Sequence, residues 1–370
     1  MKLQGIKVVD LSWFLPGPYL TTALADHGAE VIKVEPPGEG DPGRHIRPAD
    51  DRTSVFFRNM GRGKKSVVLD LKSEQGRADL FRLASEADVL VESFRPGVAA
   101  RFGISYEAVK AANPGIVYCS ISAFGQDGAY PGRAAHDLAL EAMAGVLSLT
   151  LGDDGRPAIP GIPVADLVSG LHGLSGVLIA LLRRKDTGRG DYIDVSMHEA
   201  LIASCANVVG STFSENKHPD VKQQRTTGGS AFYRVYDTSD GRQLVLAGQE
   251  MKFIKNLLGA LGQPEMAPLC EWPGAHQKPV VDFLASTFRE KPLAHWMTWL
   301  DTLDICYGPV NTLPEAIADA NLAKRGMIVT DAQGRKHLAP VVRFQDEPSQ
   351  PLYREPLLGE HTEEVLKRGR

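Results

Sequence analysis

The chain has 370 residues, of which 43% are hydrophobic and 23% charged, and its formal net charge is −4 at pH 7. This ordinary balance predicts a soluble protein with two or three structural units and a large core. The slight negative charge argues against a nucleic-acid partner.

The cysteines are far apart in the sequence and form neither a CxxC pair nor a metal-ligand pattern; they are Cys119, Cys205, Cys270 and Cys306. We therefore expect reduced thiols, a cytoplasmic location and no metal site. The N-terminus lacks the apolar segment of a signal peptide, and no apolar run approaches the length of a membrane span, so no membrane association is expected.

Strand and helix patterns alternate over the first part of the chain. Strands are expected at 6–12, 30–37, 65–71, 88–94 and 115–124, and helices at 16–29, 73–87 and 105–113, with Ser73 as an N-cap. Apolar strands separated by helices predict a parallel sheet that is covered on both faces. Ligands of such sheets bind beyond the carboxyl ends of the strands.

The second half is mainly helical. The stretch from 137 to about 210 has helical spacing, interrupted by a Gly/Pro loop at 152–163 and by an apolar run at 191–197. A polar segment at 214–230 precedes a predicted hairpin at 231–248, and further helices are expected at 251–261, 277–288, 292–303 and 314–325. We predict a large domain over 1–213, a smaller α+β domain over 225–325, and a segment, 326–370, that returns to the large domain.

Several sequence stretches resemble well-known functional motifs but lack the spacing or the neighbouring elements that these motifs require. The stretch "GEGDPG" (38–43) matches G-x-G-x-x-G, but it follows two prolines, contains Pro42 and precedes no helix. The stretch "GRGKKS" (61–66) lacks the spacing of a phosphate-binding loop. The sequence has no HExxH and no G-x-S-x-G, which argues against a zinc hydrolase and a serine hydrolase.

Asp166 stands between a Gly/Pro-containing loop and a helix rich in Leu, Val and Ile. It is either the N-cap of that helix or a catalytic carboxylate, and one residue can serve both roles. A helix N-terminus stabilises the ionised form, whereas apolar neighbours raise the pKa of a carboxyl group. The result is a poorly hydrated carboxylate that is suited to act as a base or nucleophile.

Two further ionisable residues stand at expected helix starts. His136 opens an apolar helix beside Asp137 and is either a capping residue or a proton-transfer group. Glu250 follows an apolar strand and is either a helix-start acid or a catalytic acid. Spacing alone does not bring these residues together, and the patterns by themselves predict only a soluble α/β enzyme.

Six ordered blocks resemble the family III CoA-transferases and their relatives, the α-methylacyl-CoA racemases. These blocks are 16–44, 61–77, 88–128 with its "FRPG", 186–197 "DTGRGDYIDVSM", 308–327 and 356–366 "PLLGEHTEEVL". The resemblance implies a Rossmann-like large domain formed by both chain ends, a smaller domain, and an interlocked homodimer. It also implies an acyl-CoA substrate with no prosthetic group, and CoA contacts from Arg95 and from Arg62 or Lys64.

The two branches of the family imply different chemistry for the same aspartate. In transferases the residue matching Asp166 is a nucleophile that forms an aspartyl-CoA thioester. In racemases it works opposite a histidine matching His136, which is hydrogen-bonded to a glutamate matching Glu250, and the two exchange the α-proton through an enolate. Because both residues are present, we expect a racemase-like isomerase, although the Asn and Tyr of the racemase motif are replaced here by Ala139 and Leu140. A CoA-transferase is the alternative, and a non-catalytic CoA-thioester-binding protein is the third hypothesis.

Overall fold

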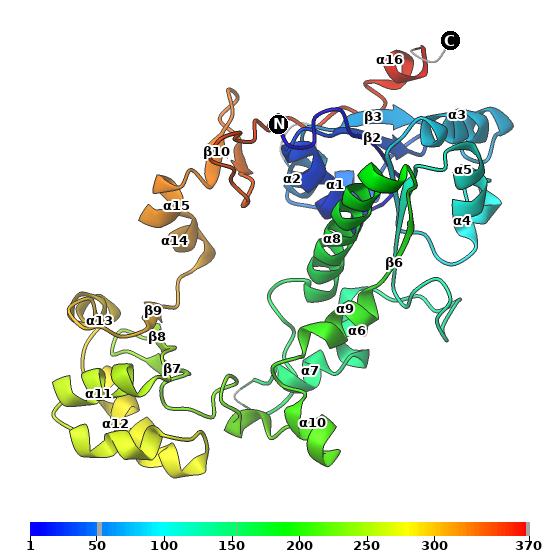
Figure 1. Ribbon diagram of the computed structural model, residues 1–370. Helices are drawn as coiled ribbons and strands as arrows, with labels where there is room; N and C mark the ends of the chain where they lie inside the picture. Colours follow the sequence, from blue (N-terminus) through cyan, green and yellow to red (C-terminus); the bar gives the residue numbers. More distant parts are fainter. Residues whose placement is uncertain (50–53, 153, 368–370) are drawn as a thin grey trace. The chain divides into compact units, whose positions relative to one another are not determined.

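A computed structural model of the chain describes residues 1–49, 54–152 and 154–367. The chain forms two compact units (Figure 1). The first consists of Met1–Ser148, Ala158–Cys205 and Ala320–Arg370, and the second of Leu149–Pro157 and Ala206–Asp319. The chain therefore leaves the first unit twice, once just before the helix that carries Asp166 and once for the longer stretch that was expected to form the smaller domain.

The first unit is built on one six-stranded parallel sheet, which confirms the predicted parallel sheet. Its strands are β1 (Lys7–Asp10), β2 (Glu30–Glu35), β3 (Lys65–Val68), β4 (Val89–Glu92), β5 (Val117–Ser122) and β6 (Tyr192–Ser196). Their order across the sheet is β3-β2-β1-β4-β5-β6. Since the chain turns back between β1 and β4, the crevice of such a doubly wound sheet opens beyond the carboxyl ends of these strands.

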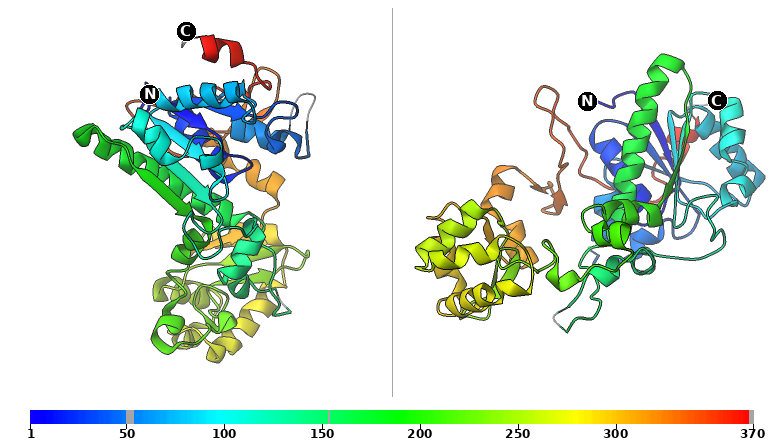
Figure 2. Two further views of the ribbon diagram at one scale, coloured as in Figure 1. Left: turned by 90° about the vertical axis from the view of Figure 1, so that its right-hand side faces the viewer. Right: turned by 60° about the horizontal axis from the view of Figure 1, so that its bottom comes forward.

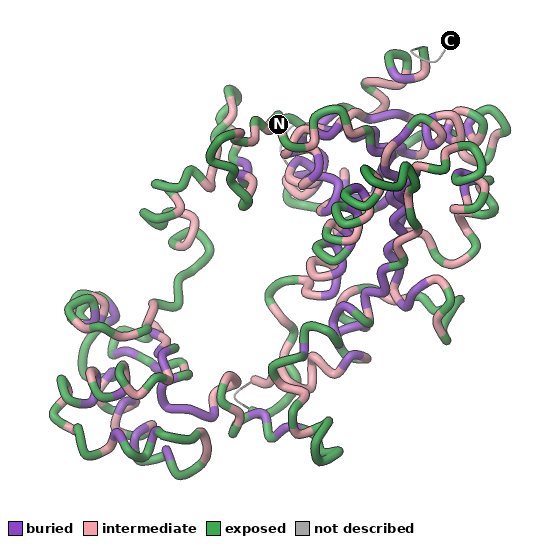
Figure 3. Tube along the Cα trace, viewed as in Figure 1, coloured by how far each residue is buried: buried purple, intermediate pink, exposed green. Residues whose placement is uncertain are grey.

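Helices cover both faces of this sheet (Figure 2). Side chains alternate along each strand, so that Val8, Val89 and Val91 pack beneath α1 (Pro16–Asp26) and α8 (Val164–Thr187). Val9 and Leu90 point to the opposite face, where α3 (Glu74–Ser85), α5 (Tyr106–Ala112) and α16 (Thr362–Lys367) pack. The buried strands form the centre of the unit (Figure 3).

Shorter elements complete the first unit. They are η1 (Pro42–His45), α2 (Val55–Gly61), α4 (Val98–Arg101), α6 (Asp137–Met143), α7 (Val146–Leu149), α9 (Met197–Ser204), α15 (Ala320–Lys324), β10 (Ile328–Thr330) and β11 (Lys336–Leu338). The predicted N-cap of α3 is confirmed, because Ser73 Oγ accepts a 3.0 Å hydrogen bond from the Gly76 N–H.

Glycines let α8 pack closely in this unit. A Cβ atom at Gly170 would lie 2.7 Å from the Pro16 carbonyl oxygen, and one at Gly173 would lie 2.8 Å from Leu20 Cδ1. By length and composition α8 is able to cross a membrane, since its most apolar stretch has a mean hydropathy of 1.7. The expectation that no segment is long and apolar enough for a membrane span is therefore wrong. In the structure, however, α8 is the crossover helix between β5 and β6, and it packs on the sheet.

The second unit contains a three-stranded antiparallel sheet of β7 (Arg234–Asp237), β8 (Gln243–Leu246) and β9 (Tyr307–Pro309). The predicted hairpin is present as β7 and β8. The helices of this unit are α10 (Gly210–Glu215), η2 (Val221–Gln223), α11 (Met251–Ala260), η3 (Pro264–Cys270), η4 (Ala275–Gln277), α12 (Lys278–Phe288), α13 (Leu293–Leu300) and α14 (Leu313–Ile317). The single helix expected at 314–325 is wrong, because α14 ends before the boundary between the two units and α15 begins after it.

Candidate active site

A cavity of about 920 Å³ opens at the carboxyl ends of all six parallel strands. Its wall contains the residues that follow each strand: Leu11, Pro36 and Pro37, Leu69–Lys72, Ser93–Pro96, Ala123–Gly125 and Met197. Further lining residues include Trp13 and Phe14 before α1, the loop that ends at His136, and Asp166. The volume and the apolar lining are typical of a site for a small organic ligand.

Asp166 lies in the first turn of α8, and its side chain lines the cavity. The helix begins at Val164, so Asp166 is the third helical residue and the N-cap interpretation is wrong. The free N–H groups of this turn bind another side chain instead. Asp137 Oδ1 accepts hydrogen bonds from the N–H groups of Ala165, at 2.7 Å, and of Asp166, at 3.3 Å.

A third carboxyl group completes this cluster, which comprises Asp137, Glu141 and Asp166. Glu141 is buried and accepts a 3.1 Å hydrogen bond from the Val164 N–H. Burial and the nearby charges of Asp137 and Glu141 raise the pKa of Asp166 to about 7. Asp166 is therefore able to bind and release a proton near neutral pH.

His136 directly precedes α6 and lines the same cavity as Asp166. It occupies the N-cap position of α6, as expected, but its side chain forms no capping hydrogen bond. The imidazole ring packs edge-on against Phe14, with 6.3 Å between the ring centroids. The backbone of Phe14 has a φ of 60°, an uncommon conformation for a residue with a side chain, and this conformation places the residue at the cavity wall.

Glu250 belongs to the second unit, directly before α11, where its exposed side chain forms no capping hydrogen bond. Its pairing with His136 stays a prediction. Among the described residues, no group of three His, Cys, Asp or Glu side chains is arranged to hold a metal ion. All four cysteines are free thiols, and Cys306 is the exposed one.

Arg62 and Lys64 do not line the cavity, and both are buried in ion pairs of the first unit. Arg62 binds Asp26 through two hydrogen bonds of 2.9 and 2.5 Å. Lys64 Nζ donates to Asp10 at 3.1 Å and to Thr21 at 2.7 Å. These partners hold both side chains inside the first unit, and a contact of either with CoA stays a prediction.

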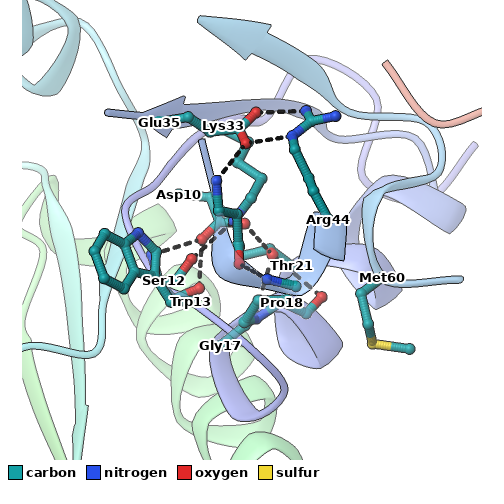
Figure 4. Close-up of polar contacts among 12 residues, drawn as sticks. Asp10, Ser12, Trp13, Gly17, Pro18, Thr21, Lys33, Glu35, Arg44 and Met60 are labelled. Atoms are coloured by element: carbon teal, nitrogen blue, oxygen red, sulfur yellow. Dashed lines mark hydrogen bonds and ion pairs between the residues drawn. The ribbon is translucent and has the colours of Figure 1, made fainter. Parts of the chain in front are cut away.

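The network around Asp10 and Lys33 holds the loop that begins the cavity wall (Figure 4). Asp10, the last residue of β1, accepts 2.5 and 2.6 Å hydrogen bonds from the hydroxyl groups of Ser12 and Thr21. Lys33 donates to the Ser12 carbonyl oxygen at 2.8 Å and pairs with Asp41 at 2.6 Å. These contacts fix the backbone immediately before Trp13 and Phe14, and so support the wall on which His136 packs.

Three exposed cations line the cavity: Lys72 after β3, Arg95 after β4 and Arg133 after β5. In the described part of the chain none of the three forms an ion pair, while the Arg133 guanidinium lies over the rings of Tyr130 and Phe124. Free cations of this kind suit phosphate groups. Arg95 was predicted for this role and Lys72 and Arg133 were not; a phosphate contact of any of the three stays a prediction.

Comparisons with known proteins identify the family of this chain. The family model described as CoA-transferase family III matches residues 3–362. Succinyl-CoA:glutarate CoA-transferase of Mus musculus is 33% identical over 99% of this chain and 86% of that protein. Alpha-methylacyl-CoA racemase of Homo sapiens is 34% identical over 99% of this chain and 93% of that protein. A crystal structure of a CAIB/BAIF family protein from Brucella suis superposes with a TM-score of 0.85 at 32% identity, over 99% of this chain and 98% of that one.

These matches extend over nearly the whole chain and include the sheet, the cavity and the helix that carries Asp166. They confirm the resemblance that the six sequence blocks indicated. Transferases and racemases stand at similar identity, so the comparisons identify the family and leave the branch open. The chain belongs to CoA-transferase family III.

Proposed function

We propose that the protein is an α-methylacyl-CoA racemase-like isomerase, which inverts the α-carbon of a branched acyl-CoA by proton transfer between Asp166 and His136. The observation that supports this most is the placement of both side chains on one cavity at the strand ends. The cavity also carries three cations that suit the phosphates of CoA. Acyl-CoA is the substrate in this proposal, and no resident cofactor is required.

In the proposed reaction one of the two groups removes the α-proton and the other returns a proton to the opposite face of the carbon. The thioester oxygen holds the enolate charge between the two steps. A base that works in both directions needs a pKa near the working pH. The pKa of Asp166, about 7, meets this condition, and histidine is the residue type that most often exchanges protons in this range.

The test is hydrogen exchange at the α-carbon without any acceptor acid. Purified protein is mixed with (R)- or (S)-2-methylacyl-CoA of several chain lengths in D₂O, and mass spectrometry follows deuterium uptake. Both enantiomers of an accepted substrate are expected to gain one deuterium and to interconvert. His136→Gln should abolish interconversion or leave exchange of one enantiomer only. His218→Gln is the matched control, because His218 is exposed and does not line the cavity.

A CoA-transferase is the second candidate, favoured by the transferase relatives and by the access of Asp166 to the cavity. In that reaction the Asp166 carboxylate attacks the thioester carbonyl and a mixed anhydride forms as CoA thiolate leaves. The thiolate then attacks the Asp166 carbonyl of the anhydride, which releases the donor acid and yields the aspartyl-CoA thioester. Movement of CoA to a free carboxylic acid, together with a hydroxylamine-trapped product at Asp166, would establish it. Turnover without α-exchange and with this product would replace the racemase proposal.

A homodimer is part of the same proposal. The outer side of α8 carries exposed apolar residues, with Ile179 and Leu182 each 68% exposed. An exposed apolar helix face of this length is suited to a second copy of the chain. Light scattering should give twice the chain mass, and Leu182→Arg should shift the protein toward the monomer, whereas a monomeric wild type contradicts the dimer.

A further inference from the structure

We propose that Glu141 is a positioning residue for Asp166, which holds the first turn of α8 from α6 and places a second acidic group beside the catalytic carboxylate. This inference rests on the proposed function, because it concerns the same carboxylate. It assigns a role to a buried acid on α6 that does not touch the cavity.

The geometry of Glu141 carries the argument. One carboxylate oxygen accepts the 3.1 Å hydrogen bond from the Val164 N–H, the first N–H group of α8. The other oxygen is buried, and burial together with the neighbouring Asp137 raises the pKa of Glu141 itself. A buried carboxyl group beside a second acid costs free energy. A neutral side chain that only packed at this position would cost less free energy to bury.

Asp137 and Glu141 bind adjacent N–H groups of one helical turn from one face. Asp137 takes those of Ala165 and Asp166, and Glu141 takes that of Val164. The N–H groups that would normally favour an ionised Asp166 are therefore directed at two other carboxylates. The first turn of α8 is held in place, while the negative charge beside it opposes ionisation of Asp166.

Other charged groups near α8 are placed differently. On the packed elements, Asp194 of β6 accepts from the Gln126 N–H, Asp26 of α1 pairs with Arg62, and the first turn of α9 contains His198 and Glu199. The two α6 acids are the charged groups that raise the pKa of Asp166 beyond the effect of burial. Asp137 also accepts a hydrogen bond from the Asp166 backbone, so a substitution there would move Asp166 as well as remove a charge. A substitution of Glu141 can remove the charge without disturbing that hydrogen bond.

The experiment replaces Glu141 by Gln, which keeps an acceptor for the Val164 N–H but removes the charge. The titration of Asp166 is followed by carbon-13 NMR of protein labelled at aspartate carboxyl carbons, with Asp166→Asn to assign the signal. We expect a wild-type midpoint near neutrality and a midpoint lower by about one pH unit in E141Q, the effect of one nearby charge. Glu199→Gln, at an exposed glutamate of α9, is the matched control and should leave the midpoint unchanged.

Two further measurements complete the test. Glu141→Asp retains the charge and should restore a midpoint close to that of wild type. In the α-exchange assay, the acid limb of the kcat/KM profile of E141Q should move to lower pH by the same amount as the NMR midpoint. An unchanged midpoint in a folded E141Q protein, or one that rises, overturns the inference. A shifted midpoint in a protein without α-exchange supports the role of Glu141 and rejects only the racemase proposal.

Discussion

Replacing Asp166 by Asn should stabilise the protein at alkaline pH. The pKa of Asp166 is raised from 3.8 to about 7, so the folded state favours the protonated acid. The unfolded chain releases this proton at lower pH than the folded protein, and the wild type therefore loses stability as the pH rises from about 4 to about 7. Asparagine resembles the protonated acid and cannot ionise, so the variant avoids this loss.

The magnitude follows from the size of the shift. One pKa unit corresponds to about 1.4 kcal/mol, which gives an upper limit of about 4 kcal/mol for a fully buried group. Asp166 is only partly buried and lines an open cavity, so solvent screening reduces the expected gain to about 1–3 kcal/mol. The gain should be near zero at about pH 4 and complete at about pH 8.

Urea unfolding, followed by tryptophan fluorescence at pH 5, 6, 7 and 8, measures this difference. The matched control is Asp186→Asn on the same helix, because the Asp186 side chain is 73% exposed. Its stability relative to wild type should not depend on pH. If the advantage of D166N is the same at every pH, Asp166 ionises as an ordinary surface acid, and both the acid-cluster argument and its use in proton transfer fail.

Three further changes test the fold and the cavity. Arg62→Gln should lower the free energy of unfolding by about 3 kcal/mol in chemical denaturation, because it leaves the buried Asp26 without its cation; a change below about 1 kcal/mol contradicts the buried pair. Gly173→Ala should cost about 1–3 kcal/mol, since its Cβ would lie 2.8 Å from Leu20, whereas Gly259→Ala on α11, with open space around it, should be neutral or stabilising. Arg95→Gln and Arg133→Gln should each raise KM for an acyl-CoA at least fivefold with little change in kcat and should weaken the dependence of KM on salt; an unchanged KM removes that residue from the phosphate contacts.

The strands were predictable because a buried parallel strand must be apolar on both faces. A continuous apolar run such as Val89–Val91 is stable only where both faces of the strand are buried, as they are inside a covered sheet. The resemblance singled out Asp166 and His136, and both line the cavity, while their roles stay predictions.

What the sequence could not show depends on contacts between distant segments. Asp137 and Glu141 cap α8 across 28 and 23 residues of chain, so the N-cap signal was attributed to Asp166 itself. The resemblance implied a CoA contact for Arg62, but its side chain is buried against Asp26, which lies 36 residues away in the sequence. No local pattern encodes either pairing, because both arise only when the sheet brings its helices together.

The order of segments in the first unit has a consequence for its synthesis. Val365, on the last helix, packs into the hydrophobic cluster under α3 and is made only after the whole of Ala206–Asp319 has emerged from the ribosome. The smaller unit is almost entirely one continuous stretch and is available to fold while the sheet still waits for its closing segment. A chain that ends soon after Asp319 lacks Val365, and it therefore leaves the apolar side chains that Val365 covers exposed to chaperones.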